Sequence, residues 1–289
     1  MNTEAIALVI TGALLHALWN LFAKKASGGL AFVWLFGVVS LLVSIPFGLL
    51  SWQANSQQLS VQAWIAISAS ALTHIVYSLV LQKGYRASDF SIVYPLARGT
   101  GPLFAIIGAI VVLGEAPTIL GWVGIFAVLA GILLIADINQ VISTPSPRAR
   151  AGLLWGSVTG VSIATYTVID GWAIKELGIA PLLYYILGLA LRTILLAPHA
   201  LRNPEKLRQQ WFLNSRYIIA VGILSPVAYT LILFAMTMAP ISYVAPTREL
   251  SMLIGVWFGT RLLREALVPS RILGTACMVL GVVMLARTH

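Results

Sequence analysis

The chain has 289 residues, of which 59% are hydrophobic and only 9% are charged. A soluble domain carries about 25% charged residues, so this composition excludes an ordinary soluble protein and indicates a chain surrounded by lipid. The formal net charge is +9, but the basic residues lie singly between apolar runs. That spacing argues against a nucleic-acid partner and for basic loops at a membrane surface.

Ten apolar runs follow one another along the chain, each near the roughly 20 residues that a spanning helix needs. They predict helices at 5–22, 30–52, 61–82, 89–113, 118–136, 152–173, 180–200, 216–238, 242–262 and 269–286. Short charged or proline-containing breaks separate them. We therefore predict an all-α polytopic membrane protein with ten transmembrane helices.

The distribution of lysine and arginine predicts the orientation. With ten helices, the loops after the first, third, fifth, seventh and ninth share one side and hold thirteen basic residues. The other side holds two, Lys175 and Arg287. Because cytoplasmic loops carry the excess of positive charge, these five loops are predicted in the cytoplasm and both termini outside.

The two halves of the chain resemble each other. Residues 77–81, 91–95 and 113–115 match 229–233, 242–246 and 263–265, in the same order and at offsets of 152, 151 and 150. We predict one five-helix repeat over 1–140, a linker over 141–151 and a second repeat over 152–289. Five is an odd number, so the second repeat is inverted, and inverted repeats place a binding site between the halves near the bilayer midplane.

A proline early in the fourth helix of each half, and Glu115 and Glu265 in the following turns, make the resemblance specific. Together with glycines at fixed spacing, these features resemble the drug/metabolite transporter superfamily, in its EamA-type ten-helix branch. Size and aromatic content are most similar to the bacterial aromatic amino-acid exporter. The resemblance implies a monomeric carrier that lies in the bacterial inner membrane and exports amino acids or related metabolites.

Polar and aromatic residues are concentrated on one face of each of six predicted helices, the first, third, fourth, sixth, eighth and ninth. Spacings of three and four place each set on a common helix face. We predict that these six helices surround a substrate cavity and that the other four brace it. The predicted substrate-binding residues are His16, Trp19, Asn20, His74, Tyr77, Ser78, Tyr94, Tyr166 and Tyr229.

Three charged residues lie within the fourth and ninth helices, where an unpaired charge is costly. At an offset of 150, Arg98 corresponds to Arg248, and at 151 it corresponds to Glu249. An Arg98–Glu249 pair across the halves, acting as gate or cavity wall, and local pairing within the ninth helix both stay open. Arg192 is near a helix end, where we expect its side chain to extend to the membrane surface.

Prolines and glycines predict where helices bend and where they touch. Pro95 and Pro246 lie at equivalent places in the two halves and are predicted hinges. Gly124 and Gly131 mirror Gly274 and Gly281 at an offset of 150, and we favour a close contact between the fifth and tenth helices there. Glu115 and Glu265 are predicted to stabilise the start of the following helix rather than to bind substrate.

Motifs of several other protein classes are absent. The sequence has no P-loop, no His-Glu-x-x-His, no Gly-x-Ser-x-Gly and no Cys/His cluster, so no ATP hydrolysis, catalytic residue, metal or cofactor is predicted. The favoured function is alternating-access transport of amino acids with aromatic or apolar side chains. A carrier of nucleosides, sugar-like compounds or drug cations, an intramembrane enzyme and an ion channel are the alternatives, and coupling to protons through a histidine stays open.

Overall fold

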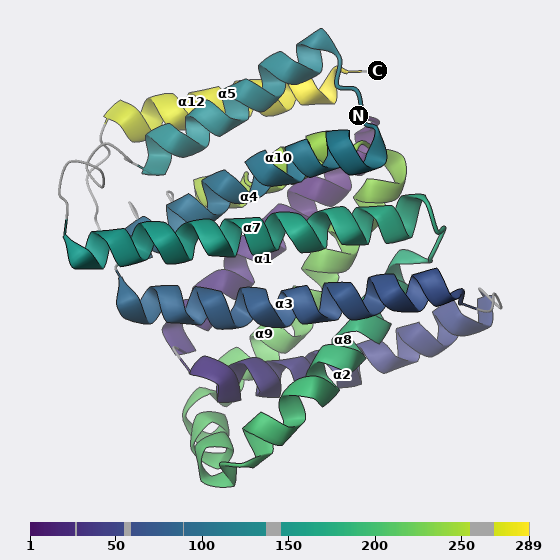
Figure 1. Ribbon diagram of the computed structural model, residues 1–289, viewed down its shortest axis with the longest axis vertical. Coiled ribbons are helices and arrows are strands. Elements are labelled where there is room, and N and C mark those ends of the chain that lie inside the picture. Colours follow the sequence, from purple (N-terminus) through teal and green to yellow (C-terminus); the bar gives the residue numbers. More distant parts are fainter. Residues whose placement is uncertain (27, 55–58, 89, 137–145, 255–268, 289) are drawn as a thin grey trace.

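A computed structural model describes residues 1–26, 28–54, 59–88, 90–136, 146–254 and 269–288 (Figure 1). These residues form helices and no strands. The helices are α1 (Thr3–Ala26), α2 (Gly29–Ala54), α3 (Val61–Ala87), α4 (Phe90–Leu113), α5 (Ile119–Ala136), α7 (Pro147–Lys175), α8 (Pro181–Leu201), α9 (Pro204–Met238), α10 (Ile241–Arg248) and α12 (Pro269–Ala286).

The described helices follow the predicted runs, with two main differences, in α10 and α9. The predicted ninth helix is broken early: α10 ends at Arg248, a turn occupies 249–250, and 255–262 lie outside the described residues. The second difference is that α9 begins at Pro204, in a stretch predicted as a break between helices. Proline at the first helical position and Glu205 in the first turn are start signals that favour this earlier helix. In addition, α7 begins at Pro147, inside the predicted linker 141–151, because Ser146 caps its first turn and Pro147 favours a helix start.

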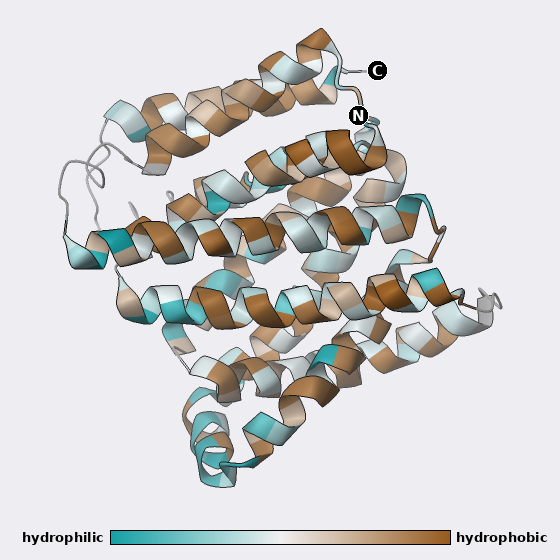
Figure 2. Ribbon diagram, viewed as in Figure 1, coloured by the Kyte–Doolittle hydropathy of each residue, from teal (hydrophilic) through white to brown (hydrophobic). Residues whose placement is uncertain are grey.

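Asn214 has non-helical backbone angles, φ −129° and ψ 15°, and divides α9 into a polar first part and an apolar second part. The polar first part lies at the lower end of the molecule in Figure 2. Elsewhere the helices carry many apolar residues on their outer surface, such as Val111 and Ile119. Eight helices are long and apolar enough to cross a bilayer, and Ile119–Ile135 of α5 is a shorter apolar helix.

The most extensive helix contacts all join the predicted first half to the predicted second half. They pair α4 and α3 with α7, α5 with α12, α1 with α9, and α2 with α8 and α9. The two termini also meet (Figure 1), because the Met1 amine donates hydrogen bonds to the carbonyl groups of Leu285 and Thr288 at 3.3 and 2.5 Å. Both termini therefore lie on one face of the helix bundle.

Helices α5 and α12 lie side by side, as the glycine pattern predicted (Figure 1). A Cβ atom built on Gly131 would lie 2.6 Å from the carbonyl oxygen of Gly274, and one built on Gly281 would lie 2.7 Å from that of Gly124. Such distances require glycine, because any side chain would force the two backbones apart. The predicted intramolecular contact is confirmed.

Candidate functional site

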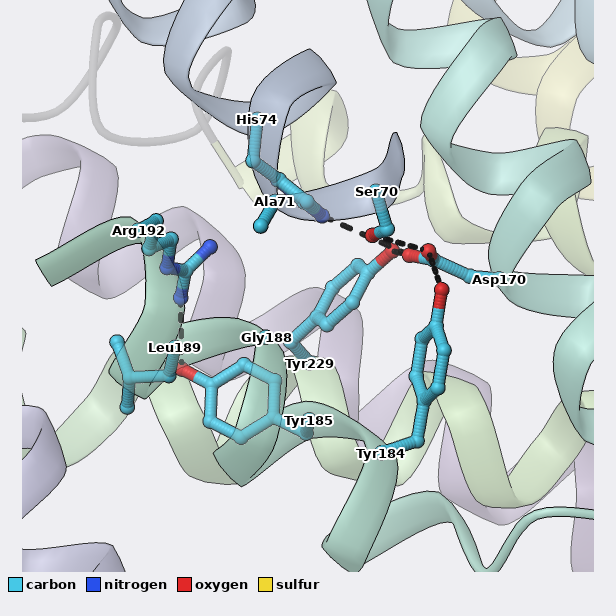
Figure 3. Close-up of a pocket in the computed structure, with 10 residues that line it drawn as sticks. All are labelled: Ser70, Ala71, His74, Asp170, Tyr184, Tyr185, Gly188, Leu189, Arg192 and Tyr229. Carbon is cyan, nitrogen blue, oxygen red and sulfur yellow. Dashed lines mark hydrogen bonds and ion pairs between the residues drawn. The ribbon is translucent and has the colours of Figure 1, made fainter. Parts of the chain in front are cut away.

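Asp170 of α7 is the centre of a buried hydrogen-bond network that joins four helices (Figure 3). Its carboxylate accepts hydrogen bonds from Ser70 of α3 at 2.5 Å, from Tyr184 of α8 at 2.7 Å and from Tyr229 of α9. His74 Nε2 of α3 lies 3.5 Å from the carboxylate oxygen Oδ2. A fully buried carboxylate is tolerated when its oxygens accept hydrogen bonds, and this network supplies the donors.

Aromatic rings pack directly beside this network. The His74 ring stacks on Tyr166 with centroids 3.9 Å apart, and Tyr77 contacts Tyr166 edge to face at 5.7 Å. Tyr229 lies 5.5 Å from His74 and 6.1 Å from Tyr166. Four of the predicted substrate-binding residues therefore form one continuous cluster, which we call the aromatic cluster (His74, Tyr77, Tyr166 and Tyr229).

A charged cluster joins α1, α4 and the end of α10. Arg98 Nη1 lies 3.2 and 3.4 Å from the two carboxylate oxygens of Glu249, and both side chains are buried. Arg98 Nη2 contacts His16 Nε2, and its guanidinium group lies 5.3 Å from the Tyr94 ring centroid. The contact between Arg98 and Glu249 that the repeat offset suggested is therefore present.

Arg248 is the third member of the charged cluster. It is 2% exposed, and its Nε lies 3.5 Å from Glu249 Oε1. Within the described part of the chain, that Nε has no hydrogen-bond partner. The pairing across the halves and the local pairing, which the sequence left as alternatives, thus occur together, while a gating role for these charges stays a prediction.

Three other predicted site residues make local contacts. The Asn20 amide donates to the carbonyl of His16 at 2.7 Å, and the Ser78 hydroxyl donates to the carbonyl of His74 at 2.8 Å. Trp19 contacts the His16 ring edge to face at 4.9 Å and packs against an apolar cluster between α1, α2 and α9. A substrate role for Trp19, Asn20 and Ser78 remains a prediction.

The two predicted hinge prolines both lie within helices. Pro246 is buried in α10. Pro95 lies in α4, and its side chain is outside the described residues. A proline inside a helix removes one backbone hydrogen bond and so permits a bend, but the hinge role of either residue stays a prediction.

Helix α8, predicted to brace the bundle, contributes directly to the site. Tyr184 binds Asp170, and Arg192 donates to the Tyr185 hydroxyl at 3.3 Å (Figure 3). Tyr185 and Arg192 line the same pocket as Asp170, so the expectation that Arg192 extends to the membrane surface is wrong. The spacing of seven between Tyr185 and Arg192 places both on one helix face and was a usable signal.

Glu115 lies outside the membrane spans, in the turn between α4 and α5. Its carboxylate accepts hydrogen bonds from the backbone N–H groups of Ile241 and Ser242 at 2.7 and 2.9 Å and pairs with Lys175 at 3.1 Å. It therefore stabilises the start of α10 in the other half, not the start of the following helix as predicted. The equivalent Glu265 lies outside the described residues.

The pKa of Glu115 reflects two opposing effects. Burial of the carboxyl group raises its pKa, but hydrogen bonds from Ser242 and Ile241 and the charge of Lys175 outweigh burial and hold the pKa below its ordinary value. A carboxylate that accepts backbone N–H bonds at a helix start favours its charged form in this way.

The polar centre of the described chain combines tyrosine and histidine rings, hydroxyl groups, two carboxylates and three guanidinium groups. Within the described ranges, no group of three or more His, Cys, Asp or Glu side chains is placed to hold a metal ion. Rings beside charged groups suit non-covalent binding of a small solute that has both an apolar and a charged part.

Comparison with known proteins identifies the family. The model of the EamA-like transporter family matches residues 3–136 and 150–287. Among solved structures, 28 chains match, and one crystal structure superposes with a TM-score of 0.74 at 16% sequence identity over 99% of both chains, which shows a common fold alone. No curated protein matches. The chain belongs to the EamA-like transporter family and is a multi-pass membrane transporter of small solutes.

Proposed function

We propose that this protein is a secondary carrier of amino acids with aromatic or apolar side chains. The observation that carries this proposal is that the aromatic cluster lies close to the charged cluster, because Ala97, the neighbour of Arg98 in α4, packs in one apolar cluster with Tyr166. Tyr166 and Tyr229 offer ring faces to an apolar side chain. Arg98 and Arg248 can interact with a carboxylate.

Alternating access is the mechanism that we propose. The two predicted repeats, 1–140 and 152–289, would move against each other around the site, joined by the predicted linker 141–151, whose last residues form the first turn of α7. Two separate matches of the family model and the extensive contacts between halves support this division. Following the family resemblance, we propose export across the bacterial inner membrane, by a monomer with both termini on the outer side.

Counterflow in liposomes tests the proposal. Purified protein is reconstituted into vesicles loaded with unlabelled L-phenylalanine, and uptake of labelled L-phenylalanine is followed with and without an imposed pH gradient. We expect transient accumulation that Tyr166→Ala reduces, because the variant loses ring contacts with His74, Tyr77 and Tyr229.

Parallel vesicles loaded with a nucleoside, a sugar or an aromatic cation test the alternative solutes. Accumulation of one of these, with none of any amino acid, would refute the amino-acid assignment. Dependence on the pH gradient would show coupling to protons, and its absence would leave exchange or facilitated transport.

A further inference from the structure

The charged cluster contains more positive than negative charge. Two arginines, Arg98 and Arg248, share the carboxylate of Glu249. The three residues are 5%, 2% and 0% exposed, in that order. A buried cation in a membrane protein is costly unless an anion compensates it. Among the residues that the structure describes, the cluster therefore has one positive charge in excess.

The carboxylate of Glu249 is directed mainly to Arg98. Arg98 Nη1 reaches both of its oxygens, at 3.2 and 3.4 Å. Arg98 Nη2 has a second partner in His16 Nε2, and because a guanidinium group only donates, that nitrogen must accept and His16 adds no charge. Arg248 Nε lies 3.5 Å from a carboxylate oxygen of Glu249, and no described residue forms a hydrogen bond with that Nε.

The other buried carboxylate of the site, that of Asp170, already has hydrogen-bond partners. Asp170 accepts hydrogen bonds from Ser70, Tyr184 and Tyr229 and lies beside His74. Ala97, next to Arg98 in α4, packs in one apolar cluster with Tyr166 and Tyr229, which places the charged cluster beside the aromatic cluster. An anion bound to Arg248 would thus have its apolar part against tyrosine rings.

We propose that Arg248 binds the carboxylate of the transported solute and that the amino group of the solute contributes little to recognition. This inference rests on the proposed function and narrows its substrate class to carboxylates with an apolar or aromatic group. The carboxylate supplies the anion that the second arginine lacks. The Asp170 carboxylate already accepts three hydroxyl hydrogen bonds and lies beside His74, so an ammonium group would have to compete with these partners there.

Three small molecules with the same ring distinguish the contributions of the two charged groups. L-phenylalanine, 3-phenylpropanoate and 2-phenylethylamine are added separately as competitors in the counterflow assay on the wild-type protein. We expect the first two to inhibit with similar potency and the amine to be at least about tenfold weaker, as the loss of one charge-assisted interaction implies. Equal or stronger inhibition by the amine would overturn the inference.

Binding to the detergent-solubilised protein, followed by tryptophan fluorescence, separates this inference from the proposed function. Binding that depends on the carboxylate, in the absence of counterflow, would refute the carrier proposal but support the carboxylate site at Arg248. Counterflow that does not depend on the carboxylate would refute the site and keep the carrier. Binding of none of the three molecules would refute the site as well.

Substitutions of single arginines test whether Arg248 is the residue that binds the carboxylate of the solute. We expect Arg248→Gln to weaken 3-phenylpropanoate binding at least about tenfold with little effect on the amine, and Arg248→Lys to restore part of the loss. Arg216→Gln, at an exposed arginine of α9, is the matched control. If Arg248→Gln leaves the selectivity intact, or if Arg192→Gln removes it instead, the inference fails.

Discussion

Replacing Glu249 with glutamine would leave Arg98 and Arg248 buried without their shared carboxylate. The relevant distances are 3.2 Å from Arg98 and 3.5 Å from Arg248. At an effective dielectric constant of about 20, each pair has a gross attraction of about 5 kcal/mol. Since the variant loses both attractions, we expect it to lower the free energy of unfolding by about 3–5 kcal/mol.

Replacing Arg98 with glutamine should be milder. It removes one attraction, but it leaves the contact between Arg248 and Glu249 and removes the repulsion between the two arginines. We expect a cost of about 2 kcal/mol or less, since the remaining charges balance. The unequal effect of the two substitutions follows from the charge excess and would not occur for an isolated pair.

Unfolding in mixed micelles measures these free energies for wild type, Arg98→Gln, Glu249→Gln and the double variant. We expect the double variant to be no less stable than Glu249→Gln, because it contains one unpaired arginine instead of two. Equal single effects that add within about 0.5 kcal/mol would refute the reasoning. In the counterflow assay, exchanging the two charges should restore part of the transport that either single change removes.

Three further substitutions test other parts of the structure. Gly131→Ala places a Cβ 2.6 Å from the Gly274 carbonyl oxygen and should lower the free energy of unfolding by about 1–3 kcal/mol. The control is Gly188→Ala, whose Cβ would meet nothing within 4 Å. Equal effects of the two substitutions would contradict the close contact. Asp170→Asn turns an acceptor of three hydroxyl bonds into a partial donor and should lower unfolding stability by about 3 kcal/mol or more; an unchanged unfolding midpoint would contradict the network. Glu115→Gln should lower the free energy of unfolding by about 1 kcal/mol at pH 7. Because the pKa of Glu115 in the folded protein is below its ordinary value, the extra stability of the wild type should be present above that ordinary value and vanish as the pH falls through the folded pKa. A stability difference that grew on acidification would refute the assignment.

The spans and the contact between α5 and α12 could be predicted because each depends on one property along the chain. Hydropathy locates a helix that must satisfy its backbone groups in lipid. Glycines that recur at fixed spacing in both halves locate backbones that approach closely. The repeat offset likewise placed Arg98 and Glu249 at matching depths, which made their contact predictable as one of two alternatives.

The rotation of each helix about its axis was harder to predict. Tyr184 and Tyr185 are adjacent, and nothing local shows which ring meets Asp170 and which meets Arg192. The arginine side chain is long enough to reach either the membrane surface or the interior. The sequence predicts Glu115 at the start of the following helix, whereas it stabilises the start of α10 in the other half. A pattern along one chain does not reveal such a tertiary partner.

Helix α10 connects the membrane surface to the proposed binding charges. Glu115 and Lys175 fix its start at Ile241, and its end carries Arg248 next to Glu249. An eight-residue helix is about 12 Å long, so α10 joins the two sites over a short distance. A solute that attracts Arg248 therefore acts on the same helix that Glu115 holds at its start, and loss of that hold should change solute affinity as well as stability. In contrast, the backbone contact between α5 and α12 permits little sliding, so movement between the halves should occur around α10 and not along that contact.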